Sequence, residues 1–195
     1  MQTPVQAPAQ NPQEYLAFLR RLRAVRLFRP DPVPQVIVDD LLRIARWSGS
    51  ARNAQPWEFV LVRDRAMLQQ LGAAEGHAQH VAGAALALVL VMAGTPERMA
   101  QETFDEGRLS ERIMLAAEAH GLGSCIGWWF NDGQTTAKQL LGIPPNKLVR
   151  TVLSIGYADE NAGRARPNPA QARKPLAALV HEERYSGTAG RETGD

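Results

Sequence analysis

A short polar loop that leads into an apolar stretch is the most informative feature of this chain. Residues 50–57 read Ser-Ala-Arg-Asn-Ala-Gln-Pro-Trp, and residues 57–63 read Trp-Glu-Phe-Val-Leu-Val-Arg. The short side chains of Ser50 and Asn53, with exposed backbone N–H groups, suit the carbonyl edge of a planar heteroaromatic ligand. The same residues are common in an ordinary helix-to-strand connection anchored by Trp57, and composition alone favours neither interpretation.

Arginines are crowded into one short window near the N-terminus. A guanidinium group can grip phosphate oxygens with two parallel hydrogen bonds, so a small-molecule phosphate site explains this density. A solvated helix face explains it equally well. Nucleic acid is less favoured, because the window lacks interleaved aromatic residues and the formal net charge is only +2. We therefore expect no nucleic-acid partner. The window contains Arg20, Arg21, Arg23, Arg26 and Arg29.

A glycine-rich segment over residues 121–127 has some features of a dinucleotide-binding loop. That motif needs a strand followed by a helix, so that the pyrophosphate meets a helix N-terminus. Here a predicted helix precedes the glycines and a predicted strand follows them, and the glycine spacing differs. We reject this interpretation. The glycines are expected to let the backbone pass close beside a flat ligand, or to turn the chain.

The sequence offers no complete set of metal ligands or catalytic side chains. His77 and His80 are three residues apart, but zinc needs further ligands, and His120, Glu118 and Cys125 match no known spacing. We therefore predict no metal, and a small buried cysteine is the default interpretation of Cys125. The arginines could bind a phosphate and the loop over 50–57 could bind a ring, but the sequence shows no catalytic acid, base or nucleophile. This combination favours a bound cofactor that performs the chemistry itself.

Composition indicates one soluble globular domain. The chain has 195 residues, with 45% hydrophobic and 22% charged residues, which is long enough to bury a substantial core. Its single cysteine allows no intrachain disulfide. Residues 1–13 lack the features of a signal peptide, and the longest apolar run, residues 81–94, is too short to span a bilayer. We expect a cytoplasmic protein without a membrane partner.

Hydrophobic periodicity predicts an α+β fold, a sheet with helices around it. The run over 84–92 is almost continuously apolar, which is typical of a central strand covered on both faces. The helix over 104–120 is apolar on several faces and ends at Gly121, so we expect it to be buried, with a partner subunit as a plausible cover. Further helices are predicted over 15–23, 36–47, 66–71 and 135–141, and strands over 57–63, 84–92, 124–130 and 149–157.

Several segments, taken together in order and spacing, resemble the FMN-dependent nitroreductase family over most of the chain, from about residue 20 to 180. Family members carry an Arg-Ser-x-Arg-x-Phe segment, a Pro-Ser-x-x-Asn-x-Gln-Pro-Trp loop, a Gly-Leu-Gly-Ser turn after an alanine-rich helix, and three shorter elements. The corresponding segments here are 23–28, 49–57, 121–124, 141–144 (Leu-Gly-Ile-Pro), 154–157 (Ser-Ile-Gly-Tyr) and 173–176 (Arg-Lys-Pro-Leu).

The resemblance implies a mostly antiparallel central sheet surrounded by helices, built as an intertwined homodimer with two FMN sites at the subunit interface. Length and composition predict a single domain over 14–182, which the resemblance identifies as FMN-binding, between flexible tails at 1–13 and 183–195. Family chemistry is ping-pong: NAD(P)H passes a hydride to flavin N5, and the reduced flavin then reduces a small-molecule electron acceptor such as a nitro compound or a quinone. A binding module that holds FMN or a deazaflavin without turnover is the alternative.

The resemblance also assigns phosphate and flavin contacts to particular residues. By position, Arg23, Arg26 and Arg173 would hold the FMN phosphate. Ser50 and Asn53 would reach the flavin from the other subunit.

The remaining assignments concern the edges of the flavin ring and the acceptor. The backbone at Gly127 and Trp128 would lie beside the N5 edge, and His77 and His80 would face the pyrimidine edge. We expect residues 94–108, with the aromatic cluster at 128–130, to shape the acceptor pocket, and Trp129 to be a core residue.

Three positions depart from the family pattern. Ala24 replaces a serine, Gly49 replaces a proline, and Gln171 stands where some members carry a second lysine. Losing one neutral hydroxyl contact costs about 1 kcal/mol, whereas each charge-assisted arginine contact contributes about 1.5–3 kcal/mol. We therefore expect FMN binding to be weakened at most.

Overall fold

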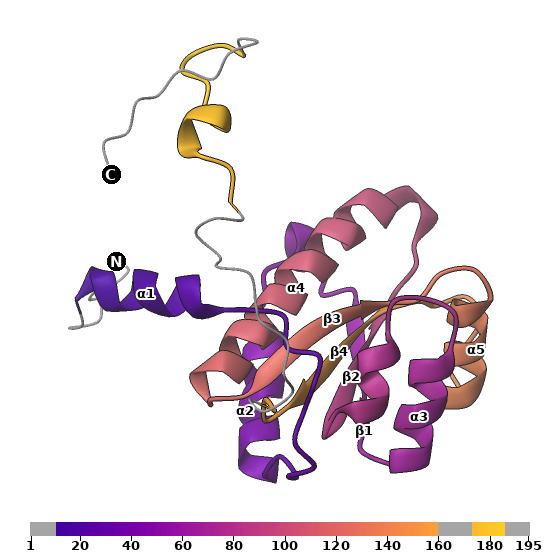
Figure 1. Ribbon diagram of the computed structural model, residues 1–195. Coiled ribbons are helices and arrows are strands. Elements are labelled where there is room, and N and C mark those ends of the chain that lie inside the picture. Colours follow the sequence, from indigo (N-terminus) through magenta and orange to yellow (C-terminus); the bar gives the residue numbers. More distant parts are fainter. Residues whose placement is uncertain (1–10, 160–172, 186–195) are drawn as a thin grey trace, which may run out of the picture. The chain divides into compact units, whose positions relative to one another are not determined.

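An antiparallel sheet organises the larger part of the chain. The computed structural model describes residues 11–159 and 173–185, and the chain divides into two compact units, Met1–Asp159 and Glu160–Asp195. The described residues of the first unit form a four-stranded sheet in the order β1-β2-β4-β3, with every neighbouring pair antiparallel (Figure 1). The strands are β1 (Trp57–Val62), β2 (Leu86–Met92), β3 (Gly123–Trp128) and β4 (Leu148–Gly156).

Helices cover both faces of this sheet, which confirms the predicted α+β class. Helices α2 and α4 pack on one face, and α3 and α5 pack on the other (Figure 1). Across the described residues the α-helices are α1 (Pro12–Arg21), α2 (Gln35–Arg46), α3 (Arg65–Ala73), α4 (Met99–Ala119) and α5 (Asp132–Leu141).

Strand β2 confirms the central strand predicted from its apolar run. All seven of its residues are buried. Because side chains alternate across a strand, Leu88 and Leu90 enter the core beneath α2 and α4, whereas Val89 and Val91 enter the core beneath α3 and α5. Because both faces of this strand pack against helices, none of its side chains points to solvent. Its sequence is therefore an uninterrupted apolar run, without alternating polar residues.

Helix α4 is longer than predicted. It begins at Met99, whereas the prediction placed its start at residue 104. The prediction missed the start because Glu102, Asp105 and Glu106 are buried on the inner face of the helix and interrupt its pattern of apolar residues. At its other end Gly121 adopts φ = +70° just beyond the C-cap, the left-handed conformation expected for a glycine in that position. The buried residues form a stripe toward the sheet, while Phe104 is 77% exposed.

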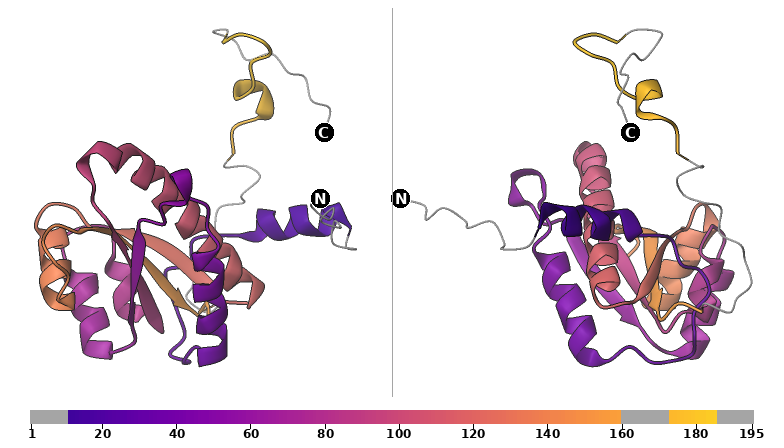
Figure 2. Two further views of the ribbon diagram at one scale, coloured as in Figure 1. Left: turned by 180° about the vertical axis from the view of Figure 1, so that it is seen from behind. Right: turned by 60° about the vertical axis from the view of Figure 1, so that its left-hand side comes forward.

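Helix α1 is not packed against the core. None of its residues is buried, although its sequence is amphipathic, and Tyr15, Leu16 and Leu19 are exposed. In the left view of Figure 2 the indigo helix α1 extends away from the sheet. The predicted tails lie largely outside the described residues, at 1–10 and 186–195. Among the described helices, none is long and apolar enough to cross a membrane.

The second unit is described over residues 173–185. It contains one short 3-10 turn, Leu176–Ala178, and the rings of His181 and Tyr185 lie 4.3 Å apart between centroids. Leu176, Leu179 and Tyr185 are exposed.

Candidate functional site

The segment that carries Arg23 and Arg26 runs along the edge strand β3. The Val25 N–H donates to Ser124 O at 2.8 Å, and Ala24 forms a parallel bridge with Ser124. A Cβ at Gly123 would lie 2.6 Å from a methyl carbon of Val25, so this close approach requires glycine. The bridge therefore fixes both arginines beside β3.

The two arginines differ in their surroundings. Arg23 is half-buried and its Nη1 donates to the carbonyls of Arg20 at 2.6 Å and Leu22 at 2.7 Å, so its guanidinium folds back on the end of α1. Arg26 is exposed and has no recorded hydrogen bond or ion pair within the described residues. Arg26 is thus the more available cation for an anionic ligand.

His80 lies on a short 3-10 segment that faces the same strand. Its Nδ1 is 2.7 Å from Ser154 Oγ, whereas its Nε2 is buried without a partner in the described structure. Burial first, and then the charge of Arg26, lower the pKa of His80 below 6.5, against smaller opposing effects of the Ile126 and His77 backbone. Burial also raises the pKa of the Cys125 thiol, against a smaller opposing effect of Arg26. Arg26, His80 and Cys125 therefore share one electrostatic environment.

The loop that carries His80 is held from both sides. Arg65, the first residue of α3, donates to Ala82 O at 2.7 Å and to Ala84 O at 2.9 Å. The His77 N–H donates to Trp128 O at 2.6 Å. These contacts fix the 79–83 segment between α3 and the end of β3.

The glycine-rich strand allows neighbouring protein segments to approach closely. A Cβ at Gly127 would lie 2.9 Å from Val152 and 3.0 Å from Ala78, just as Val25 would obstruct one at Gly123. Trp128 exposes 40% of its surface at the end of β3, whereas Trp129 is fully buried and donates its indole N–H to Leu71 O at 3.1 Å. This confirms the expectation that Trp129 is a core residue.

Ser50 and Asn53 lie on a separate loop before β1. Ser50 Oγ accepts the Gln55 N–H at 2.9 Å, and the Ala51 N–H donates to Asp105 of α4 at 3.2 Å. Asn53 is exposed and has φ = +53°, and Arg52 and Gln55 also have positive φ. Three such non-glycine residues within four positions are uncommon and concentrate backbone strain in this loop.

A cavity of about 380 Å³ opens beside this loop. Residues from 51–56 line one side, and residues from 97–105 line the other. The second group falls within the segment 94–108 that we predicted to shape an acceptor pocket.

The candidate residues therefore form two groups in the first unit. Arg23, Arg26, His80, Gly127 and Trp128 come together along β3, whereas the loop of Ser50 and Asn53 is tied to α4. No recorded hydrogen bond or ion pair in the described residues joins the two groups directly. The predicted residue Arg173 belongs to the second unit and is exposed there.

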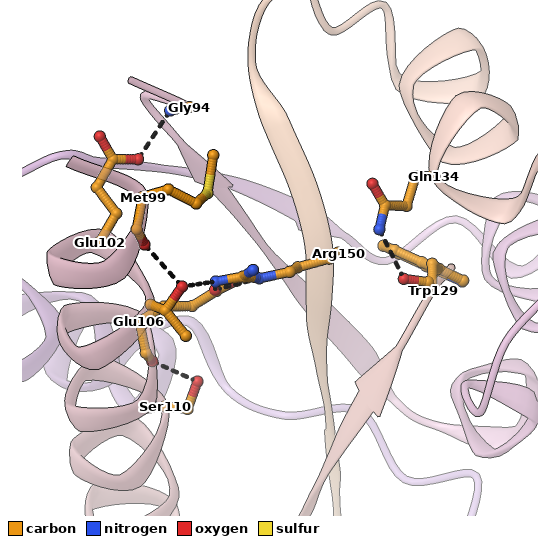
Figure 3. A network of polar contacts seen from close by, with 9 residues as sticks. Gly94, Met99, Glu102, Glu106, Ser110, Trp129, Gln134 and Arg150 are labelled. Carbon is orange, nitrogen blue, oxygen red and sulfur yellow. Dashed lines mark hydrogen bonds and ion pairs between the residues drawn. The ribbon is translucent and has the colours of Figure 1, made fainter. Parts of the chain in front are cut away.

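Sequence reasoning missed a polar network between α4 and β4. Arg150 reaches from β4 to α4, where its Nε donates to Glu106 Oε2 at 2.7 Å (Figure 3). Glu102 accepts the backbone N–H groups of Gly94 at 2.8 Å and Thr95 at 3.2 Å. The available signal was the spacing of Glu102, Asp105 and Glu106, which continues the stripe of Leu109 and Ile113 and so places carboxylates on the buried face.

Comparison with known proteins identifies the family of this chain. The profile of the Nitroreductase family matches residues 19–107 and 74–157. The chain belongs to the nitroreductase family. It is 31% identical, over 149 residues, to an Archaeoglobus fulgidus protein whose assigned name offers both NADH dehydrogenase and NAD(P)H nitroreductase, covering 74% of this chain and 86% of the relative. A Thermus thermophilus protein named NADH dehydrogenase is 29% identical over 180 residues, covering 74% and 86%.

The fold of this nitroreductase-family chain is also found in solved structures. An FMN-dependent nitroreductase from Clostridium difficile R20291 superimposes with a TM-score of 0.76, covering 87% of this chain and 99% of that one, at 24% identity. At this identity the likeness supports the fold alone.

Proposed function

We propose that this protein is an FMN-dependent oxidoreductase that takes a hydride from NAD(P)H and reduces a small-molecule acceptor such as a nitro compound or a quinone. Family membership supports an oxidoreductase of this kind. The observation that carries the assignment is the convergence of Arg26 and His80, from distant parts of the sequence, on the edge strand β3.

The residues along β3 fit an anionic cofactor with a flat polar ring. Arg26 offers an uncommitted guanidinium for a phosphate or a ring carbonyl, and Arg23 can contribute its remaining N–H groups. Among the described residues, the buried Nε2 of His80 has no hydrogen bond of good geometry, and a ring edge with polar atoms would provide one. FMN, when bound, supplies the hydride-accepting and hydride-donating centre, while the chain binds and orients it.

A homodimer would complete the site. Within the described residues of one chain, no direct hydrogen bond or ion pair joins the loop of Ser50 and Asn53 to the β3 group. In a dimer, the partner subunit's copy of this loop would contact the flavin ring from the other side. The apolar face of α1 has no buried residue and supplies a surface for such an association. Arg173 would add a further phosphate contact, as the family pattern implies.

A spectrum of the purified protein tests this proposal. The protein should carry a flavin absorbance or acquire it on titration with FMN, sediment as a dimer, and consume NAD(P)H only with an acceptor or oxygen present. A colourless protein that binds no added FMN would overturn the assignment.

One observation favours a second candidate, a binding module without turnover. Ala24 offers no hydroxyl, and one guanidinium nitrogen of Arg23 is already bound to two backbone carbonyls. Bound FMN or deazaflavin that NAD(P)H cannot reduce would identify this alternative.

A further inference from the structure

The indole of Trp128 is covered on one face by a fixed cation. The guanidinium carbon of Arg150 lies 5.1 Å from the centre of the Trp128 ring, within the range of a cation–π contact. The Trp128 residue nevertheless exposes 40% of its surface. The residue therefore combines a cation over its ring with substantial exposure to solvent.

Arg150 is itself anchored and cannot leave this position freely. Its Nε donates to Glu106 Oε2 at 2.7 Å, and its Nη2 donates to Thr103 Oγ1 at 2.8 Å. The side chains of Arg150 and Glu106 are only 13% and 4% exposed. Glu106 and Thr103 on α4 thus hold the guanidinium beside the Trp128 indole. Figure 3 shows Arg150 reaching Glu106 on this helix.

This ion pair is costly as a stabilising device. Burying two charges removes their hydration, and apolar residues of similar size are often no less stabilising. Glu106 Oε1 is also buried without a recorded partner in the described structure. Because stability alone does not explain this buried ion pair, we look for a group whose position the pair fixes. That group is the indole of Trp128, which Arg150 contacts.

We infer that Arg150 is a positioning residue, which holds the open face of the Trp128 indole as a stacking wall for planar aromatic acceptors. The inference rests on the proposed function, in which the backbone at Trp128 borders the reactive edge of the flavin. Stacking on an aromatic ring contributes about 0.5–1.5 kcal/mol beyond area burial. A wall of this kind selects quinones and nitroaromatic compounds by their flat shape and is indifferent to a compact, non-planar oxidant.

Steady-state reduction of two acceptors by the FMN-loaded dimer tests the inference. Menadione serves as the planar acceptor and ferricyanide as the non-planar one, at saturating NAD(P)H. Trp128→Leu should raise the KM for menadione about fivefold to tenfold, with kcat less affected, and should raise the KM for ferricyanide by a clearly smaller factor. Trp128→Phe should restore most of the menadione KM.

Variants of the anchor separate positioning from stability. Arg150→Met alone leaves Glu106 unpaired, so the double variant Arg150→Met/Glu106→Gln is used, and Arg150→Lys tests conservative rescue. The double variant should raise the menadione KM in the same direction as Trp128→Leu. Lys147→Met is the matched control, because it removes a nearby positive charge that pairs with Glu58 instead; it should leave both acceptors unchanged.

Different outcomes distinguish the two levels of the proposal. If the unmodified protein binds no flavin, the proposed function fails. If it turns over but the variants change both acceptors equally, or neither, the positioning role of Arg150 is wrong. Quenching of the Trp128 fluorescence by menadione in the oxidised protein, obtained by difference from Trp128→Phe, gives a readout that is independent of turnover; its absence also contradicts the inference.

Discussion

His80 Nδ1 lies 2.7 Å from Ser154 Oγ, a contact that joins the loop before β2 to β4, the strand that pairs with β3. Ser154 Oγ in turn approaches the Cys125 carbonyl on β3 at 3.4 Å. The contact holds the imidazole beside the positive charge of Arg26, and this placement has a measurable pH dependence.

The first prediction concerns acid sensitivity. The folded-state pKa of His80 lies below the unfolded-state value of 6.5, so the folded protein binds fewer protons and its stability falls as the pH drops below that value. Removing the imidazole by His80→Gln should reduce this loss. Urea unfolding at pH 7.5 and pH 5.5 measures it, with the exposed His77→Gln as the control. Parallel pH profiles for the original protein and His80→Gln would contradict the prediction.

The second prediction concerns the available cation. Arg26→Ala should weaken FMN binding at least tenfold, because a charge-assisted contact is lost. The thermal transition of the apo-protein should stay nearly constant, because Arg26 has no recorded hydrogen bond or ion pair in the described residues. Arg29→Ala is the neighbouring control, since Arg29 pairs with Asp31. A collapse in stability would show instead that Arg26 is structural.

The third prediction concerns the approach of residues 23–28 to β3. Gly123→Ala should destabilise the protein and weaken FMN binding, because the added methyl would lie 2.6 Å from Val25 and displace the segment that carries both arginines. Val25→Ala in the same chain should recover part of the loss. Gly107→Ala is the control, since no atom outside its own helix lies within 4 Å of the added methyl. Equal effects at both glycines would refute the explanation.

The fourth prediction concerns the buried ion pair. Arg150→Met should lower the free energy of unfolding by about 3 kcal/mol, because Glu106 would be left as an unpaired buried charge. Arg43→Met removes an exposed ion pair with Asp40 and should cost less than about 1 kcal/mol. Urea denaturation of both variants gives the comparison. Losses of similar size would show that the burial of Glu106 carries no penalty.

The elements that follow a simple hydrophobic rule could be predicted from the sequence. The uninterrupted apolar run over β2 identified the central strand, and the glycine after α4 identified the end of that helix. The first turn of α4 was missed because buried carboxylates satisfied by distant donors look like surface residues in a sequence. Arg150 pairs with Glu106, 44 residues away, and a local sequence pattern cannot predict a pair so far apart in the chain.

The candidate site shows the same division. Local motifs identified Arg23, Arg26 and the loop of Ser50 and Asn53 as residues of interest. The bridge between Ala24 and Ser124 could not be inferred, because it depends on how a segment without regular structure meets an edge strand. The separation of the residues into a β3 group and a loop group also emerges only from the tertiary contacts.

That separation leads to the central claim, a flavin site completed by two chains. A purified heterodimer of one Arg26→Ala chain and one Asn53→Ala chain, selected with two different affinity tags, tests it most directly by FMN titration. A composite site predicts that each variant homodimer binds weakly, while the heterodimer recovers one site of original affinity. A heterodimer with no restored site would contradict the account, because both residues would then act within a single chain.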